Sequence, residues 1–290
     1  PSLPTKIPFL RAEIREFAVK NIYTKKLFQN IYDFIPEDKI KLLMHLDNSL
    51  DDATGNCAVK EKGTVKIIVQ IVGGTTEKLS HKQEGEYISD FVGPLGVPTH
   101  IDGIKRACIV GGGVGCAIAM PIAEKLHEMG AQVTSIIGFR GKDLLILEDE
   151  FKNCSDTLKI MTDDGSYGEK GNVTAPLKEM LENGEKFDII IAIGPLVMMK
   201  YVVLTAKPFA TPVTVSMNPI MIDGTGMCGG CRLSLNVNGE KVTKFACVDG
   251  PDFNGYEVDF DEAISRGKMY STFEKHAHEA TCSLFKKEVE

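Results

Sequence analysis

Hydrophobic and polar residues alternate along the middle of the chain in a strand–helix–strand rhythm. Short aliphatic runs are separated by segments whose apolar positions recur every three or four residues, as on one face of a helix. The pattern predicts strands over 106–110, 132–138, 158–162, 187–193 and 213–217. It predicts helices over 117–129, 142–153, 174–183 and 197–206, with Thr174 as an N-cap and Gly130 as a C-terminal cap. Such alternation indicates a parallel sheet covered by helices.

The first hundred residues are patterned differently. Apolar residues recur at roughly helical spacing over 10–31, which favours a helix rather than strands. The β-branched run over 63–72 and the short apolar run over 84–92 each end at glycines and predict strands. These two strands indicate a small β domain ahead of the parallel sheet.

Length and charge narrow the class of protein. A chain of 290 residues exceeds what one hydrophobic core usually organises, so roughly two or three domains are expected. No apolar run approaches the ~18 residues of a membrane span, and no basic-then-apolar signal segment opens the sequence. Lys and Arg total 33 against 40 Asp and Glu, a net charge of −7, which argues against a nucleic-acid binder. We therefore expect a cytoplasmic protein that binds neither a membrane nor nucleic acid.

A glycine-rich loop lies between the predicted strand 106–110 and the predicted helix 117–129, with glycines at 111, 112, 113 and 115. In that context free backbone N–H groups can hold a diphosphate, which favours a nucleotide site over a plain β–α turn. A Rossmann site places an acidic residue about twenty residues further on, where this chain has Arg140. Arg140 suits contact with a ribose or a phosphate, or a solvated strand end, so NAD and NADP both stay open.

Three of the eight cysteines have the spacing of a metal centre. Asp223 is followed by Cys228-Gly-Gly-Cys231 and then by the more distant Cys247. Plant-type [2Fe–2S] ferredoxins use a Cys-x4-Cys-x2-Cys run and a distant fourth cysteine, and a carboxylate can also ligate iron. The pattern favours a [2Fe–2S] cluster; a structural zinc or three unligated thiols are the alternatives. The remaining cysteines have no ligand spacing and are expected to be buried or incidental: 57, 108, 116, 154 and 282.

Longer strings carry a family resemblance. Residues 215–231 (VSMNPIMIDGTGMCGGC) and 244–261 (KFACVDGPDFNGYEVDFD) closely resemble the small (alpha) subunit of NADH-dependent ferredoxin:NADP oxidoreductase. That family is also named sulfide dehydrogenase beta subunit or ferredoxin–NADP reductase alpha subunit. Further matching strings are VGPLG from 92, GGGVG from 111, KDLLI from 142, TDDGSYG from 162 and IGP from 193. The electron-transfer subunit of dihydroorotate dehydrogenase is similar in plan, but it usually has Cys at the position of Asp223.

The resemblance, which covers about residues 62–262, implies a fold of class α/β plus β. It implies a ferredoxin-reductase-like β-barrel flavin domain, a parallel-sheet nucleotide domain and a small C-terminal [2Fe–2S] domain. The expected boundaries are 1–100 for the flavin domain (atypical over 1–61), 101–218 for the NAD(P)-binding domain, 219–262 for the cluster domain and 263–290 for a tail.

The resemblance also implies an activity and a set of sites. Hydride would pass from NADH to FAD and single electrons would continue through the cluster, so no catalytic side chain is expected. The implied cluster ligands are Asp223, Cys228, Cys231 and Cys247. The residues implied to surround NAD(H) or NADP(H) are Gly111, Gly113, Gly115, Arg140, Asp164 and Gly194. The residues implied to face the FAD diphosphate are Gly74, Thr75 and Thr76, for which a plain strand-end turn is the alternative.

The implied partner is a larger flavin and [4Fe–4S] subunit, on which electron bifurcation takes place, and, through that complex, ferredoxin. The first 61 residues depart from the family. Its members carry an Arg-x-Pro-Leu-[Ser/Thr] flavin signature before the strand that starts near Gly63, whereas residues 51–58 here contain neither Arg nor Pro. The alternative hypotheses are therefore a non-catalytic iron–sulfur electron-wire or assembly subunit without its own flavin, or the electron-transfer subunit of dihydroorotate dehydrogenase. The acidic stretch 249–262 is expected to be a partner-docking surface or a solvated one.

Overall fold

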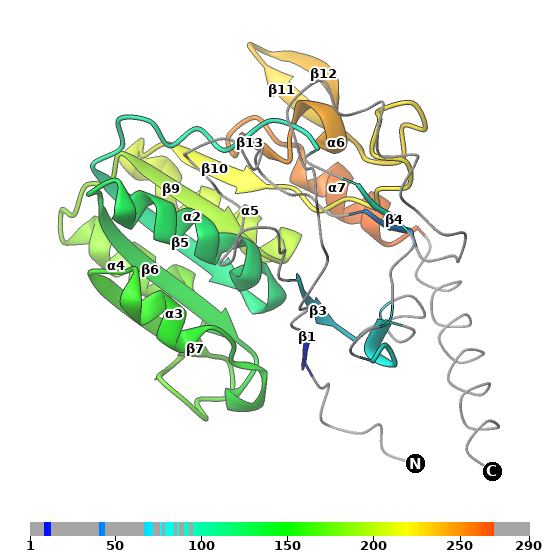
Figure 1. The fold of residues 1–290 in the computed structure, drawn as a ribbon. Helices are drawn as coiled ribbons and strands as arrows, with labels where there is room; N and C mark the ends of the chain where they lie inside the picture. The colour runs from blue at the N-terminus through cyan, green and yellow to red at the C-terminus, as the bar shows by residue number, and fades with distance from the viewer. Residues whose placement is uncertain are drawn as a thin grey trace.

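In a computed structural model of the chain, the described residues are 9–12, 41–43, 67–71, 76, 79–83, 86, 90–92 and 95–269. Its centre is a seven-stranded sheet (Figure 1). In spatial order the strands are β13 (Asp252–Asn254), β10 (Val213–Ser216), β9 (Ile189–Ile193), β5 (Arg106–Gly112), β6 (Gln132–Phe139), β7 (Thr157–Thr162) and β8 (Glu169–Lys170). Neighbouring strands are parallel except for β13, which pairs antiparallel with β10. The predicted parallel sheet is thus confirmed.

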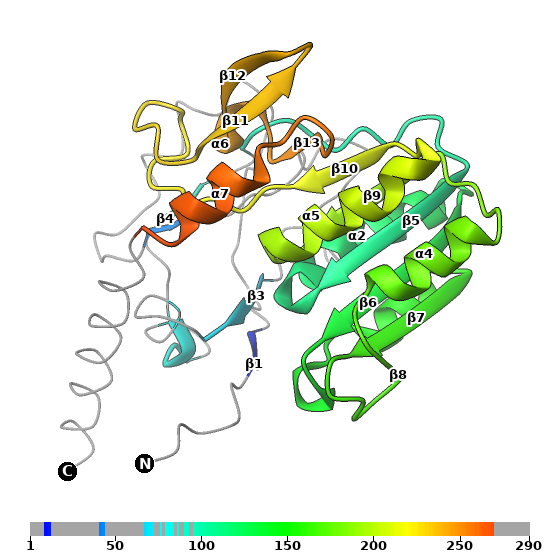
Figure 2. The ribbon, with the colours of Figure 1, turned by 180° about the vertical axis from the view of Figure 1, so that it is seen from behind.

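Helices cover both faces of this sheet. α2 (Cys116–Glu128) and α3 (Glu148–Asn153) lie on the face seen in Figure 1, and α4 (Thr174–Glu182) and α5 (Leu196–Ala206) lie on the face seen in Figure 2. Alternate residues of β5 point into the two layers: Ala107 and Ile109 pack with α2, whereas Cys108 and Val110 pack with α4 and α5. All five residues of β9 are buried, as its continuous apolar run predicts.

Two local predictions differ from the structure. The helix predicted over 142–153 is divided into η4 (Lys142–Leu144) and α3, because Leu147 adopts a left-handed conformation with φ of 60° between them. Thr174 does not cap α4: Val173 occupies the N-cap, and the Thr174 hydroxyl donates to Asn172 Oδ1 at 2.6 Å. Gly130 does end α2, with a φ of 82° and its N–H bonded to His127 O.

The described parts of the first hundred residues form two strand pairs. β1 (Phe9–Ala12) pairs antiparallel with β3 (Ile67–Gln70), and β2 (Lys41–Leu43) pairs parallel with β4 (Asp90–Val92). β3 and β4 lie within the strands predicted over 63–72 and 84–92. The helical interpretation of 10–31 is wrong at 10–12, where a ladder to a distant strand overrides the local spacing; residues 13–31 lie outside the described part.

The chain after β10 returns to the sheet. A loop leads to the antiparallel hairpin β11 (Arg232–Val237) and β12 (Glu240–Phe245), which stands above the sheet in Figure 1. α6 (Ala246–Asp249), β13 and α7 (Phe260–Gly267) follow. Leu233, Leu235 and Phe260 join the core under α5, so this segment packs against the parallel sheet as well as pairing with it.

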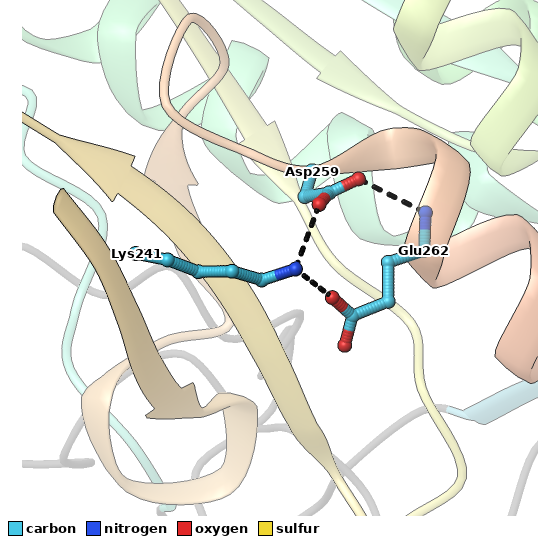
Figure 3. A network of polar contacts seen from close by, with 3 residues as sticks. All are labelled: Lys241, Asp259 and Glu262. Atoms are coloured by element: carbon cyan, nitrogen blue, oxygen red, sulfur yellow. Dashed lines mark hydrogen bonds and ion pairs between the residues drawn. The ribbon is translucent and has the colours of Figure 1, made fainter. Parts of the chain in front are cut away.

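Lysines pair with most of the acidic stretch 249–262. Lys241 on β12 contacts Asp259 Oδ2 at 3.2 Å and Glu262 Oε2 at 2.6 Å, and Asp259 Oδ1 caps α7 by accepting the Glu262 N–H (Figure 3). Lys200 pairs with Asp261 and Lys244 with Asp249. The Lys241 contacts join the hairpin to α7; whether the stretch also docks a partner stays a prediction. No helix in the described part of the chain is long and apolar enough to cross a membrane.

Candidate nucleotide and iron–sulfur sites

The sheet has a topological switch point between β5 and β9. From β5 the chain passes through α2 to β6 on one side, and from β9 it passes through α5 to β10 on the other. In open parallel sheets, ligands bind in the crevice outside the carboxyl ends of the strands at such a point. Gly111 lies near the end of β5, and Gly113 and Gly115 lie in η3 (Gly113–Gly115) directly after it. Gly194 directly follows β9. The structure therefore brings these four predicted residues together.

The glycines at this point have different physical roles. A Cβ on Gly115 would lie 2.6 Å from Ile193 O and 2.8 Å from Gly194 Cα, so the loop can meet β9 only without a side chain there. A Cβ on Gly111 would lie 2.8 Å from Cys116 Sγ. Gly113 is left-handed, with a φ of 56°, and nothing lies within 4 Å of its Cβ position. Gly113 is thus the glycine of this group that faces open space, where a diphosphate can approach the backbone.

Arg140 and Asp164 lie just after β6 and β7, in two connected loops. The Asp164 N–H donates to Arg140 O at 3.3 Å, and both side chains are exposed. Asp164 Oδ1 accepts from the Ser166 hydroxyl at 2.6 Å and the Ser166 N–H at 2.9 Å, and these bonds lower the pKa of Asp164. The ends of β6 and β7 thus place an arginine and an ionised carboxylate in adjoining loops.

Sequence reasoning missed Ser166 and Tyr167 in this region. The Ser166 hydroxyl accepts the Lys142 N–H at 2.8 Å, so it links the two loops. The Tyr167 hydroxyl donates to Glu148 Oε1 at 2.8 Å, and Lys142 Nζ lies 5.3 Å from the Tyr167 ring centre. Both residues belong to the string TDDGSYG from 162, which also contains Asp164, so the string itself is the signal that could have found them.

Asp223 organises the exposed part of the loop between β10 and β11, residues 217–231, which we call the cluster loop. Its Oδ1 accepts the Thr225 N–H at 2.9 Å and its Oδ2 accepts the Cys228 N–H at 2.8 Å. These backbone hydrogen bonds, that from Thr225 first, lower the pKa of Asp223. The carboxylate is therefore ionised and lies beside Cys228, which is exposed.

Cys231 and Cys247 form the buried part. Cys231 precedes β11 and Cys247 lies in α6, and their Sγ atoms are 3.2 Å apart. Burial and the contact with Cys231 raise the pKa of Cys247 to about 11. A metal would have to displace the proton of such a thiol on binding.

The donor set fits an iron–sulfur cluster in its chemistry. Three thiols and a carboxylate suit iron, and the Gly230 N–H donates to Cys228 Sγ at 3.3 Å, the kind of contact that tunes such centres. The structure brings the predicted ligands together in two pairs, Asp223 with Cys228 and Cys231 with Cys247. Within the described residues, no three His, Cys, Asp or Glu side chains converge on one metal-binding point.

The remaining predicted positions lie partly within the described residues and partly outside them. Gly74 and Thr75 lie outside the described residues, as do Cys57 and Cys282, whereas Thr76 is described and half-buried. Cys108, Cys116 and Cys154 are buried, as expected of cysteines without a ligand role. Burial raises the pKa of Cys108 and Cys116 well above the usual range of thiols, which leaves both unreactive.

The chain is similar to known proteins over about three quarters of its length. Residues 218–259 match the family model described as the iron–sulfur cluster binding domain of dihydroorotate dehydrogenase B. A homologue of the dihydroorotate dehydrogenase B (NAD(+)) electron transfer subunit from Thermotoga maritima is 50% identical over 219 residues, 76% of each chain. The Bacillus pumilus electron transfer subunit of that enzyme is 35% identical over 201 residues, 68% of this chain and 75% of its own.

A solved structure is similar over the same extent. A chain from a study of flavin-based electron bifurcation by NADH-dependent reduced ferredoxin–NADP oxidoreductase is 49% identical, with a TM-score of 0.68. The match covers 75% of this chain and 77% of that chain.

The fold and these comparisons define an electron-transfer subunit of an NAD(P)H-dependent flavin and iron–sulfur oxidoreductase, with the ferredoxin-reductase-like architecture. More particularly, the chain belongs to the family of dihydroorotate dehydrogenase B electron transfer subunits and their homologues. The predicted fold class, the family resemblance and the cofactors of that family, FAD, NAD(P) and an iron–sulfur cluster, are confirmed.

Proposed function

We propose that this subunit passes electrons between NAD(H), FAD and a [2Fe–2S] cluster within a complex of the NADH-dependent ferredoxin:NADP oxidoreductase type. The observation that carries the proposal is the donor set Asp223, Cys228, Cys231 and Cys247, with a carboxylate as the first member. Subunits of dihydroorotate dehydrogenase usually have a cysteine there, and a chain of the oxidoreductase is 49% identical to this one. When bound, the cluster supplies one-electron transfer.

The chain's own residues bind and orient the nicotinamide nucleotide. Gly113 leaves the backbone open to the diphosphate, and the start of α2 offers N–H groups and a positive dipole. Gly111, Gly115 and Gly194 let β5 and β9 close together beneath it. Arg140 and Asp164 would meet the ribose end, where the ionised carboxylate favours the hydroxyls of NAD(H) over the added phosphate of NADP(H).

The proposal includes a cytoplasmic location, the domain boundaries at 100, 218 and 262, and FAD contacts at Gly74, Thr75 and Thr76. It also includes a larger partner subunit with flavin and a [4Fe–4S] cluster. Large apolar side chains are exposed around the cluster loop, which suits an interface: Ile220, Ile222, Met227 and Val248. Met227 is 88% exposed and directly precedes Cys228.

A visible spectrum of the full chain purified without oxygen tests the function. We expect flavin and iron–sulfur absorbance, iron and sulfide in equal amounts, and bleaching by NADH at lower concentration than by NADPH. Cluster absorbance without flavin would favour the electron-wire hypothesis, and a colourless zinc protein would contradict both.

Substitution of the carboxylate tests its role as a ligand. Asp223→Cys should keep the cluster with a shifted midpoint potential, because thiolate is a softer donor than carboxylate. Asp163→Asn, at an exposed aspartate in the nucleotide half, is the matched control and should leave the potential unchanged. An unchanged potential in Asp223→Cys would contradict ligation by Asp223.

A further inference from the structure

The turn that carries Cys247 is short and is held at its beginning by the backbone. α6 has four residues, and Cys247 is the second of them. The N–H of Ala246 donates to Cys231 O at 3.2 Å, so the first residue of the turn is tied to the residue whose Sγ contacts Cys247. A four-residue helix has too few internal hydrogen bonds to hold its own shape. Its geometry depends on contacts from outside the turn.

Asp249 supplies those contacts at the other end of the turn. Its Oδ2 accepts the Phe245 N–H at 2.8 Å, and its Oδ1 accepts from Lys244 Nζ at 3.0 Å. Both donors lie at the end of β12, directly before α6. The Asp249 carboxylate therefore bridges the two ends of the turn that contains Cys247. Charge-assisted bonds of this kind are stronger than neutral ones, and the side chains are only 29% (Asp249) and 41% (Lys244) exposed.

The same pair places two opposite charges next to a predicted ligand. An added electron at the site is favoured by a nearby positive charge and disfavoured by a nearby negative one. While Lys244 and Asp249 are both present, these effects oppose each other. Removal of either charge alone should therefore shift the midpoint potential of the site in a defined direction.

We propose that Asp249 is a positioning residue for Cys247, which it holds against Cys231 by closing the α6 turn onto β12, while its ion pair with Lys244 balances the local charge. This inference rests on the proposed function, because it takes Cys247 as a ligand of the cluster. Asp249 itself contacts neither substrate nor cofactor in this assignment.

The charge balance is tested by a redox titration of the full chain with its cofactors, in which visible circular dichroism reports the oxidation state of the cluster. Asp249→Asn should raise the midpoint potential of the cluster, Lys244→Met should lower it, and the double variant should lie near the wild type. Lys241→Met, which removes a paired lysine from the other end of β12, is the control and should leave the potential unchanged. The inference would be overturned if Asp249→Asn and Lys244→Met shift the midpoint potential in the same direction, or if neither shifts it.

The positioning is tested by cluster retention under an iron chelator and by hydrogen exchange over 246–249. Asp249→Ala should lose the cluster several-fold faster and exchange faster, and Asp249→Asn should restore most of both, because the amide oxygen still accepts the Phe245 N–H. An alanine variant that retains the cluster like the wild type overturns the inference alone. A wild-type chain that holds no cluster overturns the proposed function and this inference with it.

Discussion

The nucleotide crevice and the cluster loop are built by opposite means. At the crevice, backbone meets backbone: Gly115 lies against Ile193 and Gly194 with no room for a methyl group, over strands that are almost wholly buried. In the cluster loop, side chains bind the backbone: the Asp223 carboxylate accepts hydrogen bonds from two backbone N–H groups of an exposed turn. In the hairpin after it, lysines form ion pairs with acidic residues of the stretch 249–262. We infer that the contact of Gly115 with β9 tolerates no added atom, whereas the second region depends on charge and polar contacts.

The comparison predicts its largest effect at Gly115. Gly115→Ala would place a Cβ against carbonyl and Cα atoms that cannot rotate away, so we expect a loss of about 3 kcal/mol in the free energy of unfolding, at the upper end of overpacking costs. NADH binding should be lost with it, because β9 is pushed away from the loop. Urea unfolding and an NADH titration measure the two effects.

Gly113→Ala is the matched control two residues earlier. Its Cβ meets nothing within 4 Å, so its cost is confined to the left-handed conformation, about 1–2 kcal/mol. NADH binding should still weaken strongly, because the added methyl group occupies the approach to the backbone. Equal losses of stability in the two variants would show that packing does not distinguish these glycines.

The difference between these glycines also marks what the sequence could predict. Buried positions recur with the period of the strand or helix that carries them. The core elements and the position of the glycine-rich loop after β5 could therefore be predicted from the sequence. Which glycine packs and which stays open depends on Ile193 and Gly194, far along the chain. The strand at 10–12 depends in the same way on β3. Cysteine spacing identified the predicted cluster ligands as candidates, but their arrangement in two pairs is tertiary, because Cys231 and Cys247 are 16 residues apart.

A smaller effect, and one that depends on pH, is expected at Asp252, where the two regions meet. The residue opens β13, its Oδ2 accepts from the Thr99 hydroxyl at 2.6 Å, and its buried Oδ1 has no hydrogen-bond partner. Burial raises the pKa of Asp252 above its ordinary value of 3.8; the hydroxyls of Thr99 and Ser216 and the charge of His100 oppose the shift in part.

The sign of the pH dependence follows from that raised pKa. The folded chain holds the proton more tightly than the unfolded chain, so the contribution to stability is complete below pH 3.8 and is lost as pH rises through the folded pKa. Asp252→Asn should therefore be more stable than the wild type at neutral pH, with a flatter pH profile above 3.8. Urea unfolding across that range measures it, with the exposed Asp102→Asn as control. A wild-type profile that Asp252→Asn leaves unaltered would mean that the buried carboxyl carries no such cost.

The smallest effect is expected at the network of Figure 3. Lys241→Met removes both contacts of the lysine, with Asp259 at 3.2 Å and with Glu262 at 2.6 Å, but the Lys241 side chain is 56% exposed. Water and salt screen such pairs, so we expect a slight loss of stability at low ionic strength that disappears in concentrated salt. Thermal unfolding of both proteins at two salt concentrations measures the difference. A loss of stability that persists in concentrated salt would show that the hairpin is not held mainly by screened ion pairs. The contrast between the two regions would then be confined to their glycines.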